Sequence, residues 1–478
     1  MTALVWLRSD LRTVWHSPLT YATENHEHVS AVYFVTPGQW QHYGLAPIKL
    51  DLLMRRLLAL REELAERGLS LNLIEVEDFN AIPGALKQLC SQHSITHLYF
   101  NAEYELDERK RDHEVKELLG AQNVKVGFFH DTCMVRPDRL FNKQGAPYKV
   151  FTPYFHQWLD QLKASLPIPK AWHAPADSLC LTNSLDKDHE TLRRWLDKSS
   201  GGWPCREQDI VSQIQSFLSQ HVDQYAELRD FPAQQGTSGV SPYLSIGAVS
   251  PAQLTYQMLV QHGPELLEGQ GGAFVWLREL AWRDFYRYVM FHFPHVCRYR
   301  CFNQKYDHFH WHNDKQLFDA WCNGQTGYPI VDAAMRCLNA TGWMHNRLRM
   351  IVASFLCKHL LLPWRWGEDY FMQKLIDGDF ASNNGGWQWS ASVGTDAAPY
   401  FRIFNPAAQG QRYDPEGEFL LQWVPELKAV PRKYLHEPQK WPGARALDYP
   451  LPVVEHKQAV AATKERFSQF LESQSMAE

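Results

Sequence analysis

The sequence predicts a protein of two domains: an α/β domain with a doubly wound parallel sheet, followed by an all-helical domain. Over roughly the first 130 residues, short apolar runs alternate with helical patterns, which is typical of a parallel sheet covered by helices. Beyond residue 202 the strand signals disappear and helical periodicity dominates. At 478 residues the chain is also too long for a single hydrophobic core.

Five apolar runs are predicted as strands: residues 3–7, 29–36, 71–76, 95–100 and 124–129. The helical patterns between them are clearest at residues 48–67 and 105–119, where apolar residues recur every three or four positions. Doubly wound sheets bind ligands outside the carboxyl ends of their strands. The sequence has neither a G-x-G-x-x-G after the first strand nor a GK[ST] loop, so an ordinary dinucleotide or nucleoside triphosphate site is not expected in this domain.

The α/β domain is predicted to span residues 1–133 and the helical domain residues 202–478, joined by a linker over residues 134–201. Recurring Pro, Asp and Ser residues indicate the linker, which contains a predicted helix near residues 154–164. The helical domain has predicted helices at residues 207–219, 251–262, 274–291, 328–340, 343–361, 368–375 and 457–473.

Composition excludes several classes of protein. With 45% hydrophobic and 21% charged residues, the chain is not disordered, collagenous or a coiled coil. No apolar run is long enough to cross a bilayer, and Met1 leads into a charged segment rather than a signal peptide. The nine cysteines include no CxxC pair, which favours a reducing compartment, so a cytoplasmic location is expected. Because the formal net charge is −5, binding of nucleic acid would need a local basic patch.

Two segments have the composition to bind phosphate groups. Residues 236–241 combine glycines with hydroxyl side chains before a predicted helix, which suits a pyrophosphate but also an ordinary helix-capping loop. Between residues 329 and 367, five Arg or Lys residues accompany a single acid, Asp332, and are interleaved with tryptophans. Such a stretch suits a DNA backbone with a base-stacking platform, or a solvated helix face balanced by acids elsewhere.

Residues 377–389 carry acids, amides and three glycines between aromatic residues, a composition that predicts neither a regular helix nor a strand. Asp379 is expected to form a buried ion pair with Arg349, which would fix the position of a polar ring bound next to it. A metal site is disfavoured because no His or Cys follows at ligand spacing. No HExxH, G-x-S-x-G or kinase signature is present, so a bound organic cofactor is expected to carry out the chemistry.

Tryptophan is concentrated in the predicted helical domain. Nine of the 18 tryptophans fall within residues 276–389. Each one alone is best explained by core packing, whereas the cluster as a whole could also form a stacking surface or an electron path.

Five motifs resemble the photolyase/cryptochrome flavoprotein family. They are WLRSDLR at residues 6–12, WLRELAWRDFY at 276–286, GYPIVDAAMR at 327–336, WMHNRLRM at 343–350 and the segment at 377–389. The likeness covers nearly the whole chain and is closest to the bacterial class I cyclobutane pyrimidine dimer photolyases. It implies a monomeric carbon–carbon lyase, with no metal and no membrane partner, that uses light to repair pyrimidine dimers in UV-damaged DNA.

The resemblance also implies FAD, folded into a U in the helical domain. The phosphates and sugar of FAD are matched by Tyr225, Thr237, Ser238, Gly239, Val240 and Ser241, and its ring and adenine by Trp282, Asn346, Arg349, Asp377, Gly378, Asp379 and Asn383. By its family position beside flavin N5, Asn383 can hydrogen-bond the ring without adding negative charge, which suits a stored anionic FADH⁻.

The implied mechanism is transfer of an electron from light-excited FADH⁻ to a flipped-out dimer, which splits the cyclobutane before the electron returns. The residues matched to the dimer pocket are Glu279, Trp282, Asn346, Met350, Asn383 and Trp389, and those matched to an electron chain between the flavin and the surface are Trp311, Trp364 and Trp387. Contacts to DNA are implied for Arg229, Glu279, Trp282, Arg283, Asn346, Arg347 and Gln409.

A second chromophore is implied for the first domain. Glu108 matches a pterin-binding acid, and Cys297 with Arg298 matches the place where the other domain meets that pterin, so a 5,10-methenyltetrahydrofolate antenna is expected. The chain departs from the closest pattern in having Tyr43 in place of a histidine and Trp15-His16 in place of Asp-Asn.

Three alternatives within the family are a cryptochrome-type blue-light photosensor, a (6-4) photolyase and a single-strand-specific photolyase. The sequence shows no long C-terminal extension and carries Asn383 where many sensors have Asp or Cys, which disfavours the sensor. The stretch at residues 343–350 has one histidine, His345, where a (6-4) photolyase is expected to be His-rich. The single-strand-specific enzyme is not excluded by spacing.

Overall fold

The computed structural model describes residues 2–181, 184–186 and 188–475. The chain divides into two compact units. Unit 1 consists of Met1–Asp223, Ser238–Pro294 and Ile376–Ala381, and unit 2 of Gln224–Thr237, His295–Leu375 and Ser382–Glu478. Met1 and residues 182–183 and 187 of the predicted linker lie outside the described residues. The domain boundaries after residues 133 and 201 stay a prediction.

Unit 1 contains a five-stranded parallel sheet. Its strands are β1 (Thr2–Leu7), β2 (His28–Val35), β3 (Leu71–Glu75), β4 (Ile95–Asn101) and β5 (Lys125–Phe129). All five predicted strands are confirmed, each to within one residue at either end. The strand order is β3-β2-β1-β4-β5, so the chain reverses its direction of growth at β1, as in the predicted doubly wound arrangement.

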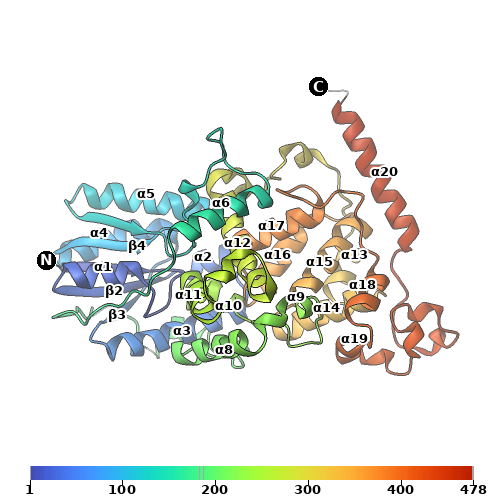
Figure 1. The fold of residues 1–478 in the computed structure, drawn as a ribbon, viewed down its shortest axis with the longest axis horizontal. Helices are drawn as coiled ribbons and strands as arrows, with labels where there is room; N and C mark the ends of the chain where they lie inside the picture. The colour runs from blue at the N-terminus through green and yellow to red at the C-terminus, as the bar shows by residue number, and fades with distance from the viewer. Residues whose placement is uncertain (1, 182–183, 187, 476–478) are drawn as a thin grey trace. The chain divides into compact units, whose positions relative to one another are not determined.

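Helices cover both faces of this sheet. Leu4 and Trp6 of β1 are two residues apart and therefore share a face, and both belong to one hydrophobic cluster with side chains of α4 (Ile82–Gln92) and α5 (Leu106–Gly120). In Figure 1, α5 and α3 (Pro47–Ala65) lie on opposite sides of the strands. The predicted helices at residues 48–67 and 105–119 are thereby confirmed. Because helices bury both faces of the sheet, polar side chains are expected at the ends of its strands.

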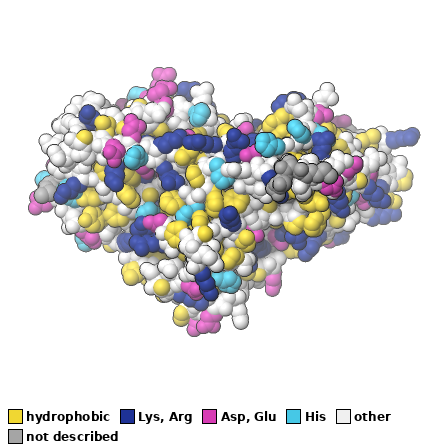
Figure 2. All heavy atoms as spheres, turned by 90° about the horizontal axis from the view of Figure 1, so that it is seen from above, with side chains coloured by type: hydrophobic (Ala, Val, Ile, Leu, Met, Phe, Trp, Pro, Cys, Tyr) yellow, Lys and Arg dark blue, Asp and Glu magenta, His cyan; other side chains and the backbone are white. Residues whose placement is uncertain are grey.

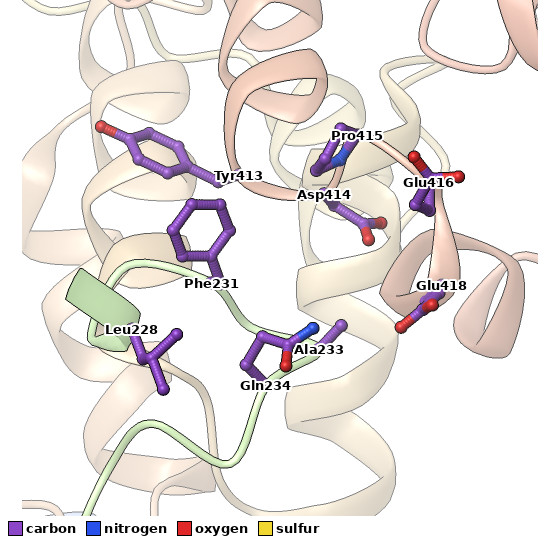
Figure 3. Close-up of a pocket in the computed structure, with 9 residues that line it drawn as sticks. All are labelled: Leu228, Phe231, Ala233, Gln234, Tyr413, Asp414, Pro415, Glu416 and Glu418. Carbon is purple, nitrogen blue, oxygen red and sulfur yellow. The ribbon is translucent and has the colours of Figure 1, made fainter. Parts of the chain in front are cut away.

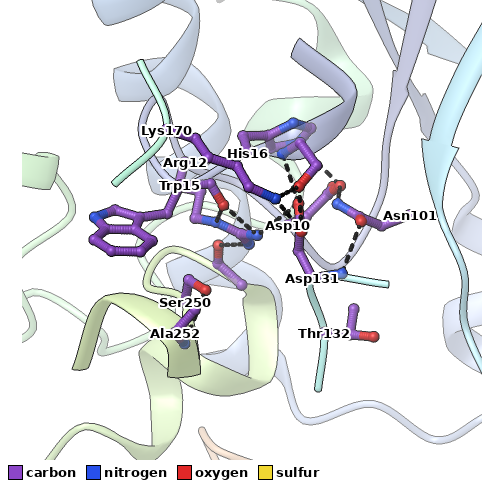
Figure 4. Close-up of polar contacts among 12 residues, drawn as sticks. Asp10, Arg12, Trp15, His16, Asn101, Asp131, Thr132, Lys170, Ser250 and Ala252 are labelled. Carbon is purple, nitrogen blue, oxygen red and sulfur yellow. Dashed lines mark hydrogen bonds and ion pairs between the residues drawn. The ribbon is translucent and has the colours of Figure 1, made fainter. Parts of the chain in front are cut away.

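Polar side chains join the carboxyl ends of β1 and β4 (Figure 4). Asp10 accepts hydrogen bonds from Arg8 N and Asn101 Nδ2, both at 2.7 Å. His16 Nε2 lies 3.0 Å from Asp10 Oδ2, and its Nδ1 accepts a hydrogen bond from Leu19 N at the start of α1 (Ser17–Asn25). Burial raises the pKa of Asp10, but His16, together with the charge of Arg12 and the hydrogen bond from Arg8 N, outweighs burial and holds this pKa below its ordinary value. The histidine that departs from the family pattern therefore pairs with a buried acid and caps a helix.

The other helices that begin and end in unit 1 are α2 (Pro37–His42), α6 (Phe151–Ala164), α7 (Glu190–Arg193), α8 (Glu207–Gln220), α10 (Ser241–Ile246), α11 (Pro251–His262) and α12 (Gly271–His292). The helices predicted at residues 154–164, 207–219, 251–262 and 274–291 are confirmed by α6, α8, α11 and α12.

Unit 2 is helical, and no strand lies beyond residue 202 in the part of the chain that the structure describes. Its helices are α9 (Tyr225–Leu228), α13 (Lys315–Cys322), α14 (Pro329–Thr341), α15 (Asn346–Ser354), α16 (Trp364–Lys374), most of α17 (Phe380–Ala391), α18 (Pro406–Tyr413), α19 (Glu418–Trp423) and α20 (His456–Ser475). The all-helical class and the helices predicted at residues 328–340, 368–375 and 457–473 are confirmed. The described helices include no candidate transmembrane segment.

The helix predicted at residues 343–361 is shorter and interrupted. It begins at Asn346, because the side chain of His345 accepts a hydrogen bond from Arg347 N and caps α15. After Ser354 the α-helical pattern gives way to one π-helical turn, Phe355–His359. The apolar periodicity continues through the start of α15 and through the π-helical turn, so the periodicity could not have located either feature.

The prediction that residues 377–389 form neither helix nor strand is wrong for most of the segment, because α17 begins at Phe380. Two consecutive glycines disfavour a helix by about 1 kcal/mol each. Tertiary contacts oppose that cost: Asn384 Nδ2 donates to Glu368 Oε1 at 2.7 Å, and Gln388 Nε2 donates to Asn384 Oδ1 at 2.9 Å. A Cβ on Gly367 would lie 2.0 Å from the Trp387 ring, so α16 and this indole are in close contact.

Candidate functional site

The predicted site residues are distributed over both units. Unit 1 contains Glu108, Ser238, Gly239, Val240, Ser241, Glu279, Trp282, Arg283, Asp377, Gly378 and Asp379. Unit 2 contains Tyr225, Arg229, Thr237, Cys297, Arg298, Trp311, Asn346, Arg347, Arg349, Met350, Trp364, Asn383, Trp387, Trp389 and Gln409.

Two segments predicted to bind the cofactor meet in unit 1. They are residues 238–241 of the hydroxyl-rich loop and the acidic turn of residues 377–379. Ser241 Oγ donates a hydrogen bond to Asp377 Oδ2 at 2.6 Å, although the two residues are 136 positions apart. Ser241 begins α10, and Gly239 before it has a φ of +60°, which glycine adopts without strain. Ser238 Oγ accepts a hydrogen bond from Trp276 Nε1 at 3.4 Å. Two serines of the loop are therefore already held by the protein.

Two cations that the sequence analysis did not select hold the acidic turn. Arg287 Nη2 lies 2.6 Å from Asp379 Oδ1, and Arg287 Nη1 lies 3.4 Å from Asp379 Oδ2. Lys49 Nζ donates to the carbonyl oxygen of Gly378. Burial lowers the pKa of Lys49, and the charges of Asp379 and Asp377 oppose that shift. Unit 1 thus supplies its own positive charges to the turn.

Helical spacing in the sequence could have indicated one of these two cations, Arg287. Glu279, Arg283 and Arg287 recur every four residues on α12 and therefore lie on one side of the helix. Glu279 and Arg283 are among the site residues predicted from the sequence, and Arg287 continues the same row. Lys49 lies on α3, far from the predicted site in sequence, and no pattern singles it out.

Arg283 is largely buried within unit 1, with 14% of its side chain exposed. Its Nη1 donates to Thr132 O at 2.5 Å and its Nη2 to Leu244 O at 3.4 Å. Burial, together with the charge of Arg287, lowers the pKa of Arg283 to about 10. The guanidinium joins two backbone segments, and its contact with DNA stays a prediction.

Trp282 of α12 lies against Phe151 of α6. The two ring centroids are 3.6 Å apart and the ring planes differ by 7°. Tyr286, one turn further along α12, is tilted against the indole at 5.7 Å. Glu279 and Trp282 are both half-buried, so an aromatic surface and a carboxylate lie within one turn of each other.

α15 carries four of the predicted residues. Asn346 and Met350 are one turn apart, as the sequence predicts. Arg349 Nε donates to Met344 O at 2.8 Å. Burial lowers the pKa of His345, the cap of this helix, to about 4. The expected ion pair between Arg349 and Asp379 stays a prediction.

Arg347 and Gln409, both predicted to contact DNA, are associated with the same part of unit 2. Arg347 Nη2 lies 2.9 Å from Asp230 Oδ1, and the Arg347 guanidinium lies 4.5 Å from the ring centroid of Tyr413. Gln409 is one turn before Tyr413 on α18, and its buried Oε1 has no hydrogen-bond partner among the described residues. The guanidinium of Arg229 lies over the Tyr225 ring at 5.3 Å.

Basic side chains are not gathered into one band on the face seen in Figure 2, where Lys and Arg are interspersed with acidic and hydrophobic side chains. A surface pocket of about 280 Å³ beside Tyr413 is lined by Leu228, Phe231, Ala233, Gln234, Tyr413, Asp414, Pro415, Glu416 and Glu418 (Figure 3). Three of these residues are carboxylates, which repel phosphate. This pocket therefore does not suit the DNA backbone.

Two of the three tryptophans predicted to carry electrons are in the core of unit 2. Trp387 and Trp364 belong to one buried hydrophobic cluster, and Trp311 packs against it. Trp321, predicted to be core packing, lies edge-on to Trp387 at 6.0 Å and donates its N–H to Val352 O. The indole N–H groups of Trp387 and Trp343 are buried without a hydrogen-bond partner among the described residues.

α17 carries Asn383 and Trp389. Asn383 Nδ2 donates to the carbonyl oxygen of Glu368 at 2.9 Å, which fixes the neutral amide on one side of the helix. Trp389 is half-buried. The Glu368 side chain holds the neighbouring Asn384, and burial raises the pKa of Glu368 to about 8.

Glu108 lies near the start of α5 in unit 1. Tyr43 donates its hydroxyl to Glu108 Oε1 at 3.3 Å, and Glu108 Oε2 is buried with no hydrogen-bond partner in the described part of the chain. Burial, reinforced by the charge of Glu105, raises the pKa of Glu108 to about 8. The tyrosine that replaces the family's histidine therefore contacts the predicted antenna acid.

Metal ligands are not grouped in this protein as far as the structure describes it. Among the described residues, no set of three or more His, Cys, Asp or Glu side chains is arranged to hold an ion.

Comparison with known proteins gives consistent matches. The family model "DNA photolyase" matches residues 3–173, and "FAD binding domain of DNA photolyase" matches residues 276–469. The deoxyribodipyrimidine photo-lyase of Salmonella typhimurium is 46% identical over 470 residues, which cover 97% of each chain. A bacterial class III photolyase from Agrobacterium tumefaciens has a TM-score of 0.87 at 33% identity, with 98% of each chain covered. The cryptochrome of Synechocystis has a TM-score of 0.85 at 29% identity, covering 97% of this chain and 98% of that one.

Proposed function

From the premise that this chain belongs to the DNA photolyase and cryptochrome family, we propose that it uses blue or near-UV light to split cyclobutane pyrimidine dimers in DNA. The observation that carries the proposal is the 46% identity, over 97% of both chains, to a deoxyribodipyrimidine photo-lyase. The partner is accordingly UV-damaged DNA. A monomeric state and a cytoplasmic location belong to the same proposal.

The chain carries an FAD-binding domain, and its residues fit the cofactor. A Cβ on Gly236 would lie 2.6 Å from Leu228 O, so this loop needs glycine to keep its backbone path. The loop further offers hydroxyl groups and a glycine with positive φ at Gly239, which suit phosphate oxygens. The proposed phosphate and sugar ligands are Tyr225, Thr237, Ser238, Gly239, Val240 and Ser241. When bound, FAD supplies the absorption of light and the electron that opens the cyclobutane.

The residues proposed around the flavin ring and adenine are Trp282, Asn346, Arg349, Asp377, Gly378, Asp379 and Asn383. In unit 1 the Asp379 carboxylate is paired with Arg287, so this acid presents less net negative charge to an anionic ring. Asn383, oriented by the Glu368 carbonyl, offers a hydrogen bond without charge. The chain thus limits like-charge repulsion toward a reduced flavin.

Recognition of the dimer is assigned to a second group of side chains: Glu279, Trp282, Asn346, Met350, Asn383 and Trp389. Glu279 accepts a hydrogen bond from the N–H edge of a pyrimidine, and the two indoles pack against its apolar faces. Together these groups replace the stacking and pairing that the dimer loses when it leaves the duplex. Arg229, Arg283, Arg347 and Gln409 are proposed to contact the surrounding DNA.

Trp387, Trp364 and Trp311 are proposed to carry electrons between the protein surface and the cofactor. Trp387 and Trp364 share one buried cluster, and Trp311 packs on it. The N–H group of Trp387 has no hydrogen-bond partner among the described residues, so hydrogen bonding does not account for the burial of this indole.

The antenna is proposed to be 5,10-methenyltetrahydrofolate, held by Glu108, Cys297 and Arg298. The buried and unpartnered Glu108 Oε2 supports a ligand that donates a hydrogen bond, as the amino and N–H groups of a pterin do. The absorption spectrum of the purified protein tests this proposal, because a folate antenna adds a near-UV band to the flavin bands.

Repair itself is tested by illuminating the reduced, flavin-loaded protein with an oligonucleotide that contains a thymine dimer. Light-dependent recovery of intact thymines, with none in darkness, is the expected result. A yellow protein that leaves dimers intact in light would overturn the proposal. It would favour the photosensor, a candidate kept because of the structural likeness to the Synechocystis cryptochrome.

A further inference from the structure

The rings of Phe151 and Trp282 overlap face to face, with centroids 3.6 Å apart and planes 7° apart. Free aromatic pairs prefer offset or edge-on contacts, because face-to-face quadrupoles repel. The surrounding protein must therefore impose this arrangement.

Three side chains of unit 1 pack against Phe151, and one of them, Phe285, also lies against Trp282. Phe285, which is fully buried, lies edge-on to both rings, at 5.6 Å from Phe151 and 5.8 Å from Trp282. Phe155 stacks on Phe151 at 5.5 Å, and the Arg278 guanidinium lies 5.6 Å from the same ring. Only 1% of Phe151 is exposed. It is therefore a rigid support rather than a mobile side chain.

The contact leaves part of the indole accessible, and Tyr286 is tilted against it at 5.7 Å. Phe151 covers one face of Trp282, whereas Trp282 as a whole stays half-buried. An indole that must receive a flipped base needs a fixed orientation, because each rotamer that it must give up on binding weakens affinity.

We propose that Phe151 is a positioning residue for lesion recognition: it covers one face of Trp282 and holds the accessible part of the indole ready for the pyrimidine dimer. This inference rests on the proposed function and on the proposed role of Trp282. It predicts that Phe151 affects affinity for the dimer through Trp282 alone. Core packing by itself predicts no such dependence.

The test compares dissociation constants, in darkness, for a duplex with one thymine dimer and for the same duplex without it. F151L and F151M remove the ring and keep apolar volume, and F151Y restores a ring. F155L is the matched control, because Phe155 is an equally apolar, 8% exposed neighbour on α6. W282L and the double variant F151L/W282L complete a double-mutant cycle. FAD content and the thermal midpoint of every variant are recorded.

We expect F151L and F151M to weaken binding of the dimer duplex about three- to tenfold, the loss of one aromatic stack. F151Y and F155L should stay within about twofold of wild type, and no variant should change binding of undamaged duplex. In the W282L background, F151L should have almost no further effect. If leucine prevents folding, the methionine variant decides.

Three results would overturn the inference: equal effects of F151L and F155L, an undiminished effect of F151L in the W282L background, or an equal loss for undamaged duplex. The wild-type chain separates this failure from that of the proposed function. A wild type that does not prefer the dimer duplex overturns both, whereas a preference that survives F151L and F151M overturns only the role of Phe151.

Discussion

Arg287 and Asp379 are joined by an ion pair of 2.6 Å, although 92 positions separate them in the chain. Their side chains are only 9% and 17% exposed. Burial disfavours the charged form of Arg287, but the charges of Asp379, Cys133, Glu105 and Asp284 together outweigh burial and raise the pKa of Arg287 above its ordinary value. The acidic turn that is proposed to face the flavin is therefore held from within unit 1.

We expect R287M to lose bound FAD and to unfold at a lower temperature. Removing one partner of a buried pair leaves an uncompensated charge and costs about 3–5 kcal/mol. The FAD-to-protein absorbance ratio and the thermal midpoint measure both effects. R336M is the control, because Arg336 and Glu426 are 2.7 Å apart but more exposed, and its cost should stay below about 1 kcal/mol. Full FAD retention in R287M would contradict the prediction.

Glu279→Ala should reduce repair about ten- to hundredfold while FAD stays bound. The carboxylate is proposed to accept a hydrogen bond from the flipped pyrimidine, and loss of a hydrogen bond to a charged group costs about 1.5–3 kcal/mol. Dimer loss under blue light, with FAD content quantified, is the measurement. Repair at the wild-type rate would remove Glu279 from the mechanism.

Trp311→Phe should block photoreduction of the oxidised flavin and spare repair by protein that was reduced chemically beforehand. Phenylalanine keeps an apolar ring but is much harder to oxidise than an indole. The two activities are measured by flavin absorbance under light and by recovery of thymines. Trp366→Phe is the control, because Trp366 also packs on the core cluster of unit 2 and is not among the tryptophans matched to the electron chain. Equal photoreduction in both variants would exclude Trp311 from the path.

Glu368→Gln should change how stability depends on pH. The pKa of Glu368 is raised by burial from 4.5 to about 8. Between these values the folded chain keeps a proton that the unfolded chain has released, so the contribution of Glu368 to stability falls as pH rises, by at most about 1.4 kcal/mol per unit. The thermal midpoint of the variant, relative to that of wild type, should therefore rise as the pH is increased from about 5 to about 8. The exposed E418Q should follow wild type, and parallel curves for E368Q would refute the assignment.

Binding of a dimer-containing duplex should weaken steeply with salt, because a chain with net charge −5 must bind phosphates through a local patch. R347M should lower the slope of log K against log salt by about 1. K464M, at an exposed position of α20, should leave the slope unchanged. An affinity that does not respond to salt would argue against the patch.

Much of the fold could be predicted from the sequence. Short apolar runs located all five strands, and apolar residues at every third or fourth position located most of the long helices, because a strand buried on both faces and a helix buried on one face leave these patterns in the sequence. The motifs at residues 276–286 and 343–350 likewise contain seven of the candidate site residues. Helical spacing from Glu279 and Arg283 could also have indicated Arg287.

Other features depended on tertiary structure. The helix that begins at Phe380 forms although it contains two glycines, because Asn384 donates a hydrogen bond to Glu368 and Trp387 packs on Gly367. Lys49 reaches the turn at Gly378 from a helix more than 300 positions away, and Phe151 meets Trp282 from another helix.

The sequence by itself determined the two classes of domain, the order of their elements and the family, because local periodicity and contiguous motifs are sufficient to indicate them. Only the tertiary structure decided which distant side chains hold the acidic turn and support Trp282. Contacts of that kind depend on the path of the backbone through space, and no local repeat in the chain encodes the distance between two residues that the fold brings together.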